Sequence, residues 1–263
     1  MNSKSINRIP GAFAKQDGKK AFIAFITGGD PDIETSEALI RTMAAAGADM
    51  IEIGIPFSDP IAEGPTIQAA SQRALAAGCT VEKLFAMVAR LRQDLEIPLL
   101  FMTYANPVFA YGSAAFMRRC REVGIDGLIV PDVPFEERAE FAADCRANGV
   151  ALISMVSPTS AARAAAIARE AEGFLYCVSS LGVTGERATL GNEIADIIQI
   201  VRQESHIPCA IGFGISTPAQ AKEMAAYGDG VIVGSAIVRL VAEHGRNSVA
   251  KVHDFVRQMK QSL

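Results

Sequence analysis

A strand followed by a helix recurs eight times along this chain, and this repeat restricts the possible folds more than any other feature. The strand segments are short aliphatic or β-branched runs bounded by turn residues. They lie near residues 20–26, 49–54, 97–103, 127–131, 150–155, 173–178, 207–212 and 229–233. Helical patterns separate them, at 33–46, 81–95, 113–123, 136–148, 161–171, 193–205, 217–227 and 247–261. Because the strands are apolar on both faces, they are typical of a parallel sheet covered by helices.

Glycines stand where predicted helices end and the next strand begins. Glycine enters the left-handed conformation without a Cβ clash, so it ends a helix cleanly. The glycines at these joints are Gly47, Gly124, Gly149, Gly173 and Gly228. Eight such units close into a barrel more readily than they form an open sheet, and 263 residues match the roughly 250 of a (β/α)8 barrel. We therefore predict that residues 1–263 form one α/β domain, a catalytic TIM barrel, with a doubly wound open sheet as the alternative.

Two further helices and two long connections are predicted outside the repeat. Apolar spacing from Ile6 to Ala14 suits a helix that covers the barrel floor, and a second helix begins near Gly64. The connections after the second and sixth predicted strands are long, and long barrel loops usually carry the function. The stretch 182–185, Gly-Val-Thr-Gly, is typical of a lid whose glycines serve as hinges.

Charge and residue counts exclude several classes of function. The formal net charge is −4 with both signs mixed along the chain, which argues against nucleic acid or an anionic membrane as a partner. The five cysteines include no CxxC pair and the three histidines are far apart, so neither a disulfide framework nor a metal site is predicted. No run approaches the ~18 apolar residues of a membrane span, and the first residues lack the apolar core of a signal peptide. We expect a soluble, cytoplasmic protein.

Glu52 is a candidate for the chemistry because it lies late in the second predicted strand, in Met-Ile-Glu-Ile-Gly. Active sites of these barrels lie at the carboxyl ends of the strands. Strand alternation places Ile51 and Ile53 on one face and Glu52 with Gly54 on the other. A buried carboxylate is costly unless it is satisfied or useful. Glu52 is therefore either functional or a structural group that binds a backbone amide or a lysine, and the residues alone leave both open.

A second carboxylate follows in the next loop. Residues 55–62 hold two prolines and a Ser-Asp pair, which predicts an ordered loop. Glu63 then precedes Gly64-Pro65, where a helix begins, and an acid at that place commonly complements the helix dipole. Because Glu52 is expected on the same rim, the pair favours acid–base chemistry over that simpler interpretation.

Glycine pairs follow the last two predicted strands. Residues 211–216 read Ile-Gly-Phe-Gly-Ile-Ser, and residues 234–238 read Gly-Ser-Ala-Ile-Val and open a short helix. Barrels commonly bind phosphate between these two loops, because backbone N–H groups and a helix N-terminus attract its oxygens. Simple turn glycines are the alternative. The residues alone thus indicate a barrel enzyme that acts on a phosphorylated small molecule through carboxylates, without identifying the substrate.

Residues 51–68 closely resemble the signature of the tryptophan synthase α subunit family, with Glu-Ile-Gly-Ile-Pro-Phe-Ser-Asp-Pro followed by Gly-Pro-Thr-Ile-Gln. Further blocks occur in the family's order at residues 25–31, 104–109, 130–134, 182–185, 212–216 and 234–238. The resemblance extends from about residue 10 to residue 260. It implies a lyase of tryptophan biosynthesis that cleaves indole-3-glycerol phosphate to indole and glyceraldehyde 3-phosphate.

The resemblance also implies roles for individual residues. Glu52 matches the family's general acid/base, which protonates the indole carbon bearing the side chain and helps to deprotonate the glycerol hydroxyl. Glu63 falls where the family usually carries an aspartate that bonds the indole N–H. The residues that match substrate-binding positions are Phe25, Tyr104, Asp132, Ile153, Tyr176 and Thr184. Those that match the phosphate site are Gly185, Gly214, Gly234 and Ser235.

The family implies a partner as well, a β subunit that uses pyridoxal phosphate and receives indole through a tunnel in an α2β2 heterotetramer. The chain itself then needs no cofactor. The loop residues matched to the partner face are Pro56, Asp59, Asn106, Phe109 and Pro134.

Glu63 departs from the family pattern, because its extra methylene lengthens the side chain by about 1.5 Å. We hypothesise that the backbone at residues 62–64 compensates for this length. Two alternative functions stay open: a free-standing lyase that releases indole, and a catalytically silent barrel that activates a β subunit.

Overall fold

The structure is a computed structural model that describes residues 7–14, 19–158, 160–178, 187–212 and 214–263, with residues 187–193 described by their backbone alone. Within these ranges the strands form one nine-stranded parallel sheet in the order β5-β4-β3-β2-β1-β9-β8-β7-β6. The strands are β1 (Ala21–Thr27), β2 (Met50–Gly54), β3 (Leu99–Met102), β4 (Gly127–Ile129), β5 (Ala151–Leu152), β6 (Ser154–Val156), β7 (Leu175–Val178), β8 (Cys209–Gly212) and β9 (Gly230–Val233).

The sheet closes into a barrel. β1 pairs with β2 on one side and with β9 on the other, which joins the first predicted strand to the last. β5 pairs with β4, β6 pairs with β7, and only Ile153 separates β5 from β6. The fifth predicted strand is therefore interrupted at Ile153, and the chain itself links the two ends of the sheet order. The barrel prediction is confirmed, and the open-sheet alternative is excluded.

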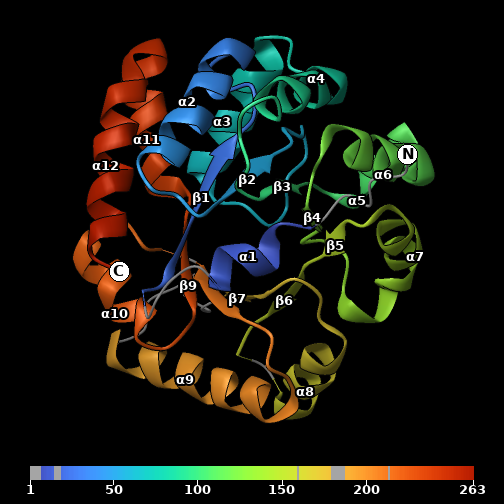
Figure 1. The fold of residues 1–263 in the computed structure, drawn as a ribbon, viewed down its shortest axis with the longest axis vertical. Coiled ribbons are helices and arrows are strands. Elements are labelled where there is room, and N and C mark those ends of the chain that lie inside the picture. The colour runs from blue at the N-terminus through green and yellow to red at the C-terminus, as the bar shows by residue number, and fades with distance from the viewer. Residues whose placement is uncertain (1–6, 15–18, 159, 179–186, 213) are drawn as a thin grey trace.

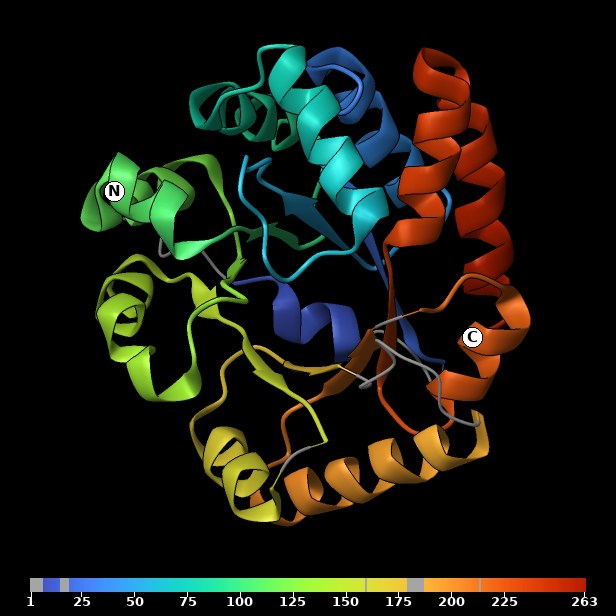
Figure 2. The same cartoon turned by 180° about the vertical axis from the view of Figure 1, so that it is seen from behind.

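Helices surround the sheet, as Figures 1 and 2 show from opposite sides. The helices are α1 (Ile9–Ala14), α2 (Ile33–Ala45), α3 (Pro65–Ala76), α4 (Val81–Leu91), α5 (Ala105–Tyr111), α6 (Ser113–Val123), α7 (Ala139–Asn148), α8 (Ala161–Glu170), α9 (Arg187–Glu204), α10 (Pro218–Ala225), α11 (Ser235–His244) and α12 (Val249–Gln261), with short 3-10 turns at Phe135–Glu137 and Gly245–Ser248. Within the described residues, no helix combines the length and the apolar character that a membrane crossing requires.

Alternate strand residues divide the apolar core. Ile51 and Ile53 pack outward against the helices, whereas Met50 packs inside the barrel with Leu100 and Phe174. This is the two-residue alternation of a strand, and it places Glu52 on the inner face with Met50. Figure 1 shows α1 lying across the centre of the ring. Its residues Ile9 and Ala12 join the inner cluster, so the predicted floor helix is confirmed.

Four of the five glycines predicted to end a helix adopt a left-handed conformation. Gly47, Gly124, Gly149 and Gly173 have φ values of 104°, 85°, 71° and 70°. Gly228 does not adopt a positive φ, so the left-handed stop predicted there is wrong. A Cβ at Gly228 would lie 2.9 Å from the carbonyl oxygen of Cys209, so close packing against β8 excludes a side chain at that position.

Candidate active site

Glu52 is completely buried inside the barrel at the carboxyl end of β2. Its backbone is in register with Phe25 on β1 and Leu100 on β3. Neither carboxylate oxygen has a hydrogen-bond partner among the described residues, so the structural alternative, an amide or a lysine held by Glu52, finds no partner there. Burial raises the pKa of Glu52 to about 8, because the charged form loses its hydration. At neutral pH the side chain is therefore mostly a carboxylic acid that can donate a proton.

A cavity of about 490 Å³ opens at the carboxyl ends of the strands. Its walls come from the strands β1, β3, β7 and β9, from the residues just before α3 and the start of that helix, from the loop after β8, and from the start of α11. Phe25 and Tyr176 line the cavity, and both are neighbours of Glu52. Phe25 is the residue paired with Glu52 across β1 and β2. Burial raises the pKa of the Tyr176 phenol, and the charge of nearby Glu52 raises it further. The buried acid thus lies next to the walls of an open cavity.

Glycines make room for these two aromatic rings. A Cβ at Gly212 would lie 2.5 Å from Cε1 of Tyr176, and a Cβ at Gly54 would lie 2.7 Å from Cζ of Phe25. On its other side Phe25 packs against Gly234, where a Cβ would lie 3.1 Å from Cδ1 of the ring. Real Cβ atoms do not approach as closely as a side chain at Gly212 or Gly54 would, so these two glycines are required for the shape of the cavity, whereas at Gly234 the Phe25 ring would have to shift by a few tenths of an ångström.

Glu63 reaches the same cavity from the residues just before α3. The hydroxyl of Tyr104 donates to Oε2 of Glu63 at 2.6 Å and accepts the Ala62 N–H at 2.9 Å. The side-chain amide of Gln68 donates to the Glu63 carbonyl at 2.8 Å. Burial raises the pKa of Glu63 and the negative charge of Asp132 raises it further, while the bond from Tyr104 opposes both. Tyr104 and the helix start thus fix the longer side chain in one position.

Asp132 lies beside this pair on the half-buried rim after β4. Both of its carboxylate oxygens accept the backbone N–H of Ala105, at 3.0 and 3.2 Å. That N–H belongs to the first residue of α5, so Asp132 caps this helix from a distant part of the chain. Tyr104, Asp132 and Glu63 are thereby held together at one side of the barrel mouth.

Another part of the cavity wall, which we call the anion side, suits an anion. Gly214, Gly234 and Ser235 line it, and α11 begins at Ser235. The first N–H groups of a helix have no intrahelical acceptor, and the helix dipole adds positive charge there. Gly214 has a φ of 70°, a conformation that favours glycine. Thr184 and Gly185, and with them the predicted lid at 182–185, lie outside the described residues.

Arg239 also lines the cavity and is absent from the sequence-based prediction. Among the described lining residues, only Glu63 and Arg239 carry a formal charge. The signal available in the sequence was an arginine four residues after Ser235, on the same face of a helix. The cavity wall therefore carries one acidic side chain and one cationic side chain.

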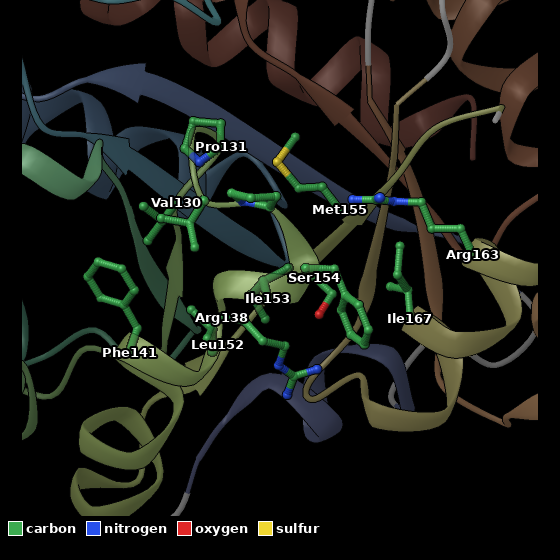
Figure 3. A pocket seen from close by; sticks show the side chains of 13 residues that line it. Val130, Pro131, Arg138, Phe141, Leu152, Ile153, Ser154, Met155, Arg163 and Ile167 are labelled. Carbon is green, nitrogen blue, oxygen red and sulfur yellow. The ribbon is translucent and has the colours of Figure 1, made fainter. Parts of the chain in front are cut away.

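Ile153 occupies a different place from the other predicted substrate-binding residues. It belongs to the inner apolar cluster and lines a second cavity of about 170 Å³ beside the β5–β6 interruption. Figure 3 shows this cavity between the broken strand, α7 and α8. Its two arginines are already engaged: Arg138 donates to the Glu170 carbonyl at 3.0 Å, and Arg163 pairs with Glu136 at 2.8 Å.

Four of the five residues predicted to face a partner lie on the surface. Asp59, Asn106 and Pro134 are exposed, and Phe109 is 48% exposed. Pro56 is buried within the chain, so its contact with a partner stays a prediction. Ile61, between Asp59 and Glu63, is 81% exposed, and the sequence-based prediction did not include it.

Potential metal ligands do not gather anywhere in the described part of the chain: no three His, Cys, Asp or Glu side chains there could share a metal ion.

Comparison with known proteins identifies the family. A family model described as tryptophan synthase alpha chain matches residues 12–263. The tryptophan synthase alpha chain of Thermoanaerobacter sp. (strain X514) is 45% identical over 98% of this chain and 100% of the relative. That of Lactiplantibacillus plantarum is 47% identical over 93% of this chain and 92% of the relative. The crystal structure of tryptophan synthase subunit alpha from Legionella pneumophila str. Paris is similar, with a TM-score of 0.88, 36% identity and 98% coverage of both chains. The chain therefore belongs to the tryptophan synthase alpha chain family of lyases.

Proposed function

We propose that this chain cleaves indole-3-glycerol phosphate to indole and glyceraldehyde 3-phosphate, with Glu52 as the general acid and base. The observation that carries the proposal is the buried Glu52, which has no hydrogen-bond partner among the described residues and whose pKa is raised to about 8, next to a cavity lined by Glu63 and Arg239. General acids work best when their pKa lies near the operating pH. We also propose that residues 1–263 form a single catalytic domain, since one apolar cluster contains residues from Phe22 to Met259.

Glu52 acts twice in the proposed reaction. As a carboxylic acid it gives its proton to the indole carbon that bears the glycerol phosphate chain, and positive charge develops at the ring nitrogen. As a carboxylate it then takes the proton of the hydroxyl on the adjacent side-chain carbon. That carbon becomes the aldehyde while the carbon–carbon bond breaks and its electron pair returns to the ring. One proton is given and one is recovered, so no oxidant or reductant takes part.

Glu63 supports this step from the cavity wall. Its carboxylate accepts the indole N–H and stabilises the positive charge that develops on the ring. The bond from Tyr104 at 2.6 Å keeps Glu63 in place, which supports our hypothesis that the local structure accommodates the longer side chain. Phe25 and Tyr176 bound the space for the ring, and Asp132 contributes through the position of α5. Ile153 and Thr184 remain proposed substrate contacts.

The phosphate lies at the anion side of the cavity in this proposal. Backbone N–H groups of Gly214, Gly234 and Ser235, together with Gly185, bind its oxygens, and the N-terminus of α11 adds positive charge. The two poles, Glu63 and the α11 terminus, orient the substrate so that the bond to be broken lies near Glu52. Correct orientation is a large part of catalysis for a single bound substrate.

We further propose that the exposed face around α5 binds a β subunit, which carries the pyridoxal phosphate, in an α2β2 assembly. Ile61 and Phe109 are large apolar side chains that remain 81% and 48% exposed. Asp59, Asn106 and Pro134 complete this face. Contiguous exposed apolar surface is typical of association sites, and in this proposal Ile61 and Phe109 contribute to one. Tyr104 connects the face to the site, because it precedes α5 and contacts both Ala62 and Glu63.

The test is the turnover of indole-3-glycerol phosphate by the full chain and by its Glu52→Gln variant, with the cognate β subunit present and absent. Loss of a general acid typically lowers the rate by about 10²- to 10⁴-fold. Glu140→Gln, on the exposed part of α7, is the matched control and retains wild-type rates. Unchanged turnover in Glu52→Gln sinks the proposal. If the wild-type chain cleaves no substrate but activates the β subunit, it is the catalytically silent barrel. If it cleaves the substrate but does not comigrate with the β subunit in size-exclusion chromatography, it is the free-standing lyase.

A further inference from the structure

Arg239 is a cation without a described partner in the wall of the active-site cavity. It is exposed, and no hydrogen bond or ion pair joins it to another described residue. The arginines of the second cavity, Arg138 and Arg163, are by contrast both engaged with glutamates or a backbone carbonyl. A guanidinium at the edge of a cavity, with no partner among the described residues, is available to a ligand.

The position of Arg239 directs it toward the anion side. Arg239 follows Ser235 by four residues on α11, which is about 6 Å along a helix axis and returns to the same face. Side chains on a helix lean toward its N-terminus. A guanidinium on a flexible stem of this length therefore reaches the helix start, where Gly234 and Ser235 line the cavity.

The positive charge of Arg239 favours a negatively charged ligand. The chain carries a net charge of −4, and the other charged wall residue described for the cavity is Glu63. A phosphate monoester, with roughly −2 charge at neutral pH, approaches such a chain against a weak repulsion. Backbone N–H groups supply only partial charges. A full positive charge at the cavity mouth attracts the dianion, and the planar fork of arginine matches two phosphate oxygens.

We propose that Arg239 binds the phosphate monoester of the substrate directly and makes the site selective for phosphorylated indole compounds. This inference rests on the proposed function for the identity of the substrate. Arg239 is a substrate-binding residue and takes no part in proton transfer. Because the side chain is exposed and solvent screens its charge, the expected effect of its removal is about tenfold in affinity.

The experiment measures binding and turnover separately in the full chain. Dissociation constants are determined for 3-indolepropyl phosphate and for 3-indolepropanol, which differ only in the phosphate, with wild type and the Arg239→Gln, Arg239→Lys and Arg118→Gln variants. Arg118 lies exposed on α6, so its change alters the net charge equally without touching the cavity. Steady-state cleavage of indole-3-glycerol phosphate is then measured at low and high salt.

Arg239→Gln is expected to weaken the binding of 3-indolepropyl phosphate by about tenfold, while the affinity for 3-indolepropanol stays unchanged. KM for the phosphorylated substrate rises with little change in kcat, and the salt dependence becomes shallower. Arg239→Lys recovers part of the affinity, and Arg118→Gln matches wild type. Equal effects on both ligands, or equal effects of the two glutamine variants, overturn the inference. A wild-type chain that binds 3-indolepropyl phosphate but cleaves nothing contradicts the proposed function and leaves the binding comparison valid.

Discussion

Replacing Glu52 by glutamine is expected to make the folded protein more stable at neutral pH while it removes activity. The folded chain buries Glu52 with no described hydrogen-bond partner, and its pKa rises from 4.5 to about 8. The folded state therefore keeps a proton that the unfolded state releases once the pH exceeds the unfolded pKa. Below the pKa of the unfolded state, such a group does not reduce the free energy of unfolding. As the pH rises from that pKa toward the pKa of the folded state, the free energy of unfolding falls progressively.

The magnitude follows from the span between the two pKa values. Each pH unit inside the span costs about 1.4 kcal/mol of unfolding free energy. Between pH 5 and pH 7 the wild type therefore loses about 3 kcal/mol from this group. Glutamine does not titrate, so Glu52→Gln escapes this loss. Packing an amide at this position also changes the free energy of unfolding, but this change is the same at both pH values and cancels when they are compared.

The assay is urea unfolding of wild type and Glu52→Gln at both pH values. The stability difference between the variant and wild type is expected to grow by about 3 kcal/mol from pH 5 to pH 7. Glu140→Gln serves as the control, because Glu140 is exposed, and its difference stays flat. A flat difference for Glu52→Gln as well would mean that the carboxyl is not held protonated by burial, and our reasoning about the acid would fail.

Three further substitutions test other parts of the structure. Tyr104→Phe removes the 2.6 Å hydrogen bond to Glu63, so we expect kcat/KM to fall by about 10-fold or more. Because that hydrogen bond lowers the pKa of Glu63, its loss moves the acidic limb of the pH–rate profile to higher pH. Gly212→Ala places a methyl group 2.5 Å from the Tyr176 ring, and we expect a loss of about 1–3 kcal/mol in thermal or urea unfolding with a fall in kcat/KM. Asp126→Ala leaves the guanidinium of Arg92, 2.6 Å away, without its buried partner, and we expect about 3–5 kcal/mol of destabilisation in urea with kcat nearly unchanged in the folded fraction.

Matched controls separate these effects from generic damage. Tyr111→Phe removes a hydroxyl that contacts Glu82 far from the cavity, so it leaves kcat/KM unchanged. At Gly11 an added Cβ meets nothing within 4 Å, so Gly11→Ala is neutral. Asp94 pairs with Arg41 at the surface, and Asp94→Ala costs less than about 1 kcal/mol. Equal losses in a test variant and its control would count against the corresponding prediction.

The repeat of strands and helices could be predicted because its signals are local. Apolar runs, helix patterns and glycines at the joints sit next to the elements they define. The interruption of the fifth strand at Ile153 could not be predicted in this way. It arises where β5 pairs with β4 and β6 pairs with β7, and a strand sequence alone does not show where its two partners diverge.

Helix α5 was missed for a comparable reason. Pro107 lies in its first turn, where proline is tolerated but is easily taken for a loop residue. The start of the helix is capped by Asp132, which is 27 residues away in the chain. No capping residue therefore marks its beginning in the local sequence.

The candidate site shows the same division. Glu52 and the glycines of the anion side could be predicted because each lies at the end of a recognisable strand. The contact between Glu63 and Tyr104 joins residues 41 positions apart, so only the folded chain reveals it. Arg239 was missed because an arginine on an exposed helix is ordinarily a solvated surface residue. Its importance depends on the cavity beside it.

The most direct measurement is the titration of the Glu52 carboxyl carbon by carbon-13 NMR in the full-length protein. Glutamate labelled at Cδ supplies the signal, and Glu52→Gln identifies it by its absence. We predict that the carboxyl titrates with a midpoint near 8, and that kcat for indole-3-glycerol phosphate declines with the same midpoint as the pH rises. A carboxyl that is already ionised at neutral pH, in an enzyme that still cleaves the substrate, would contradict the role of Glu52 as the proton donor.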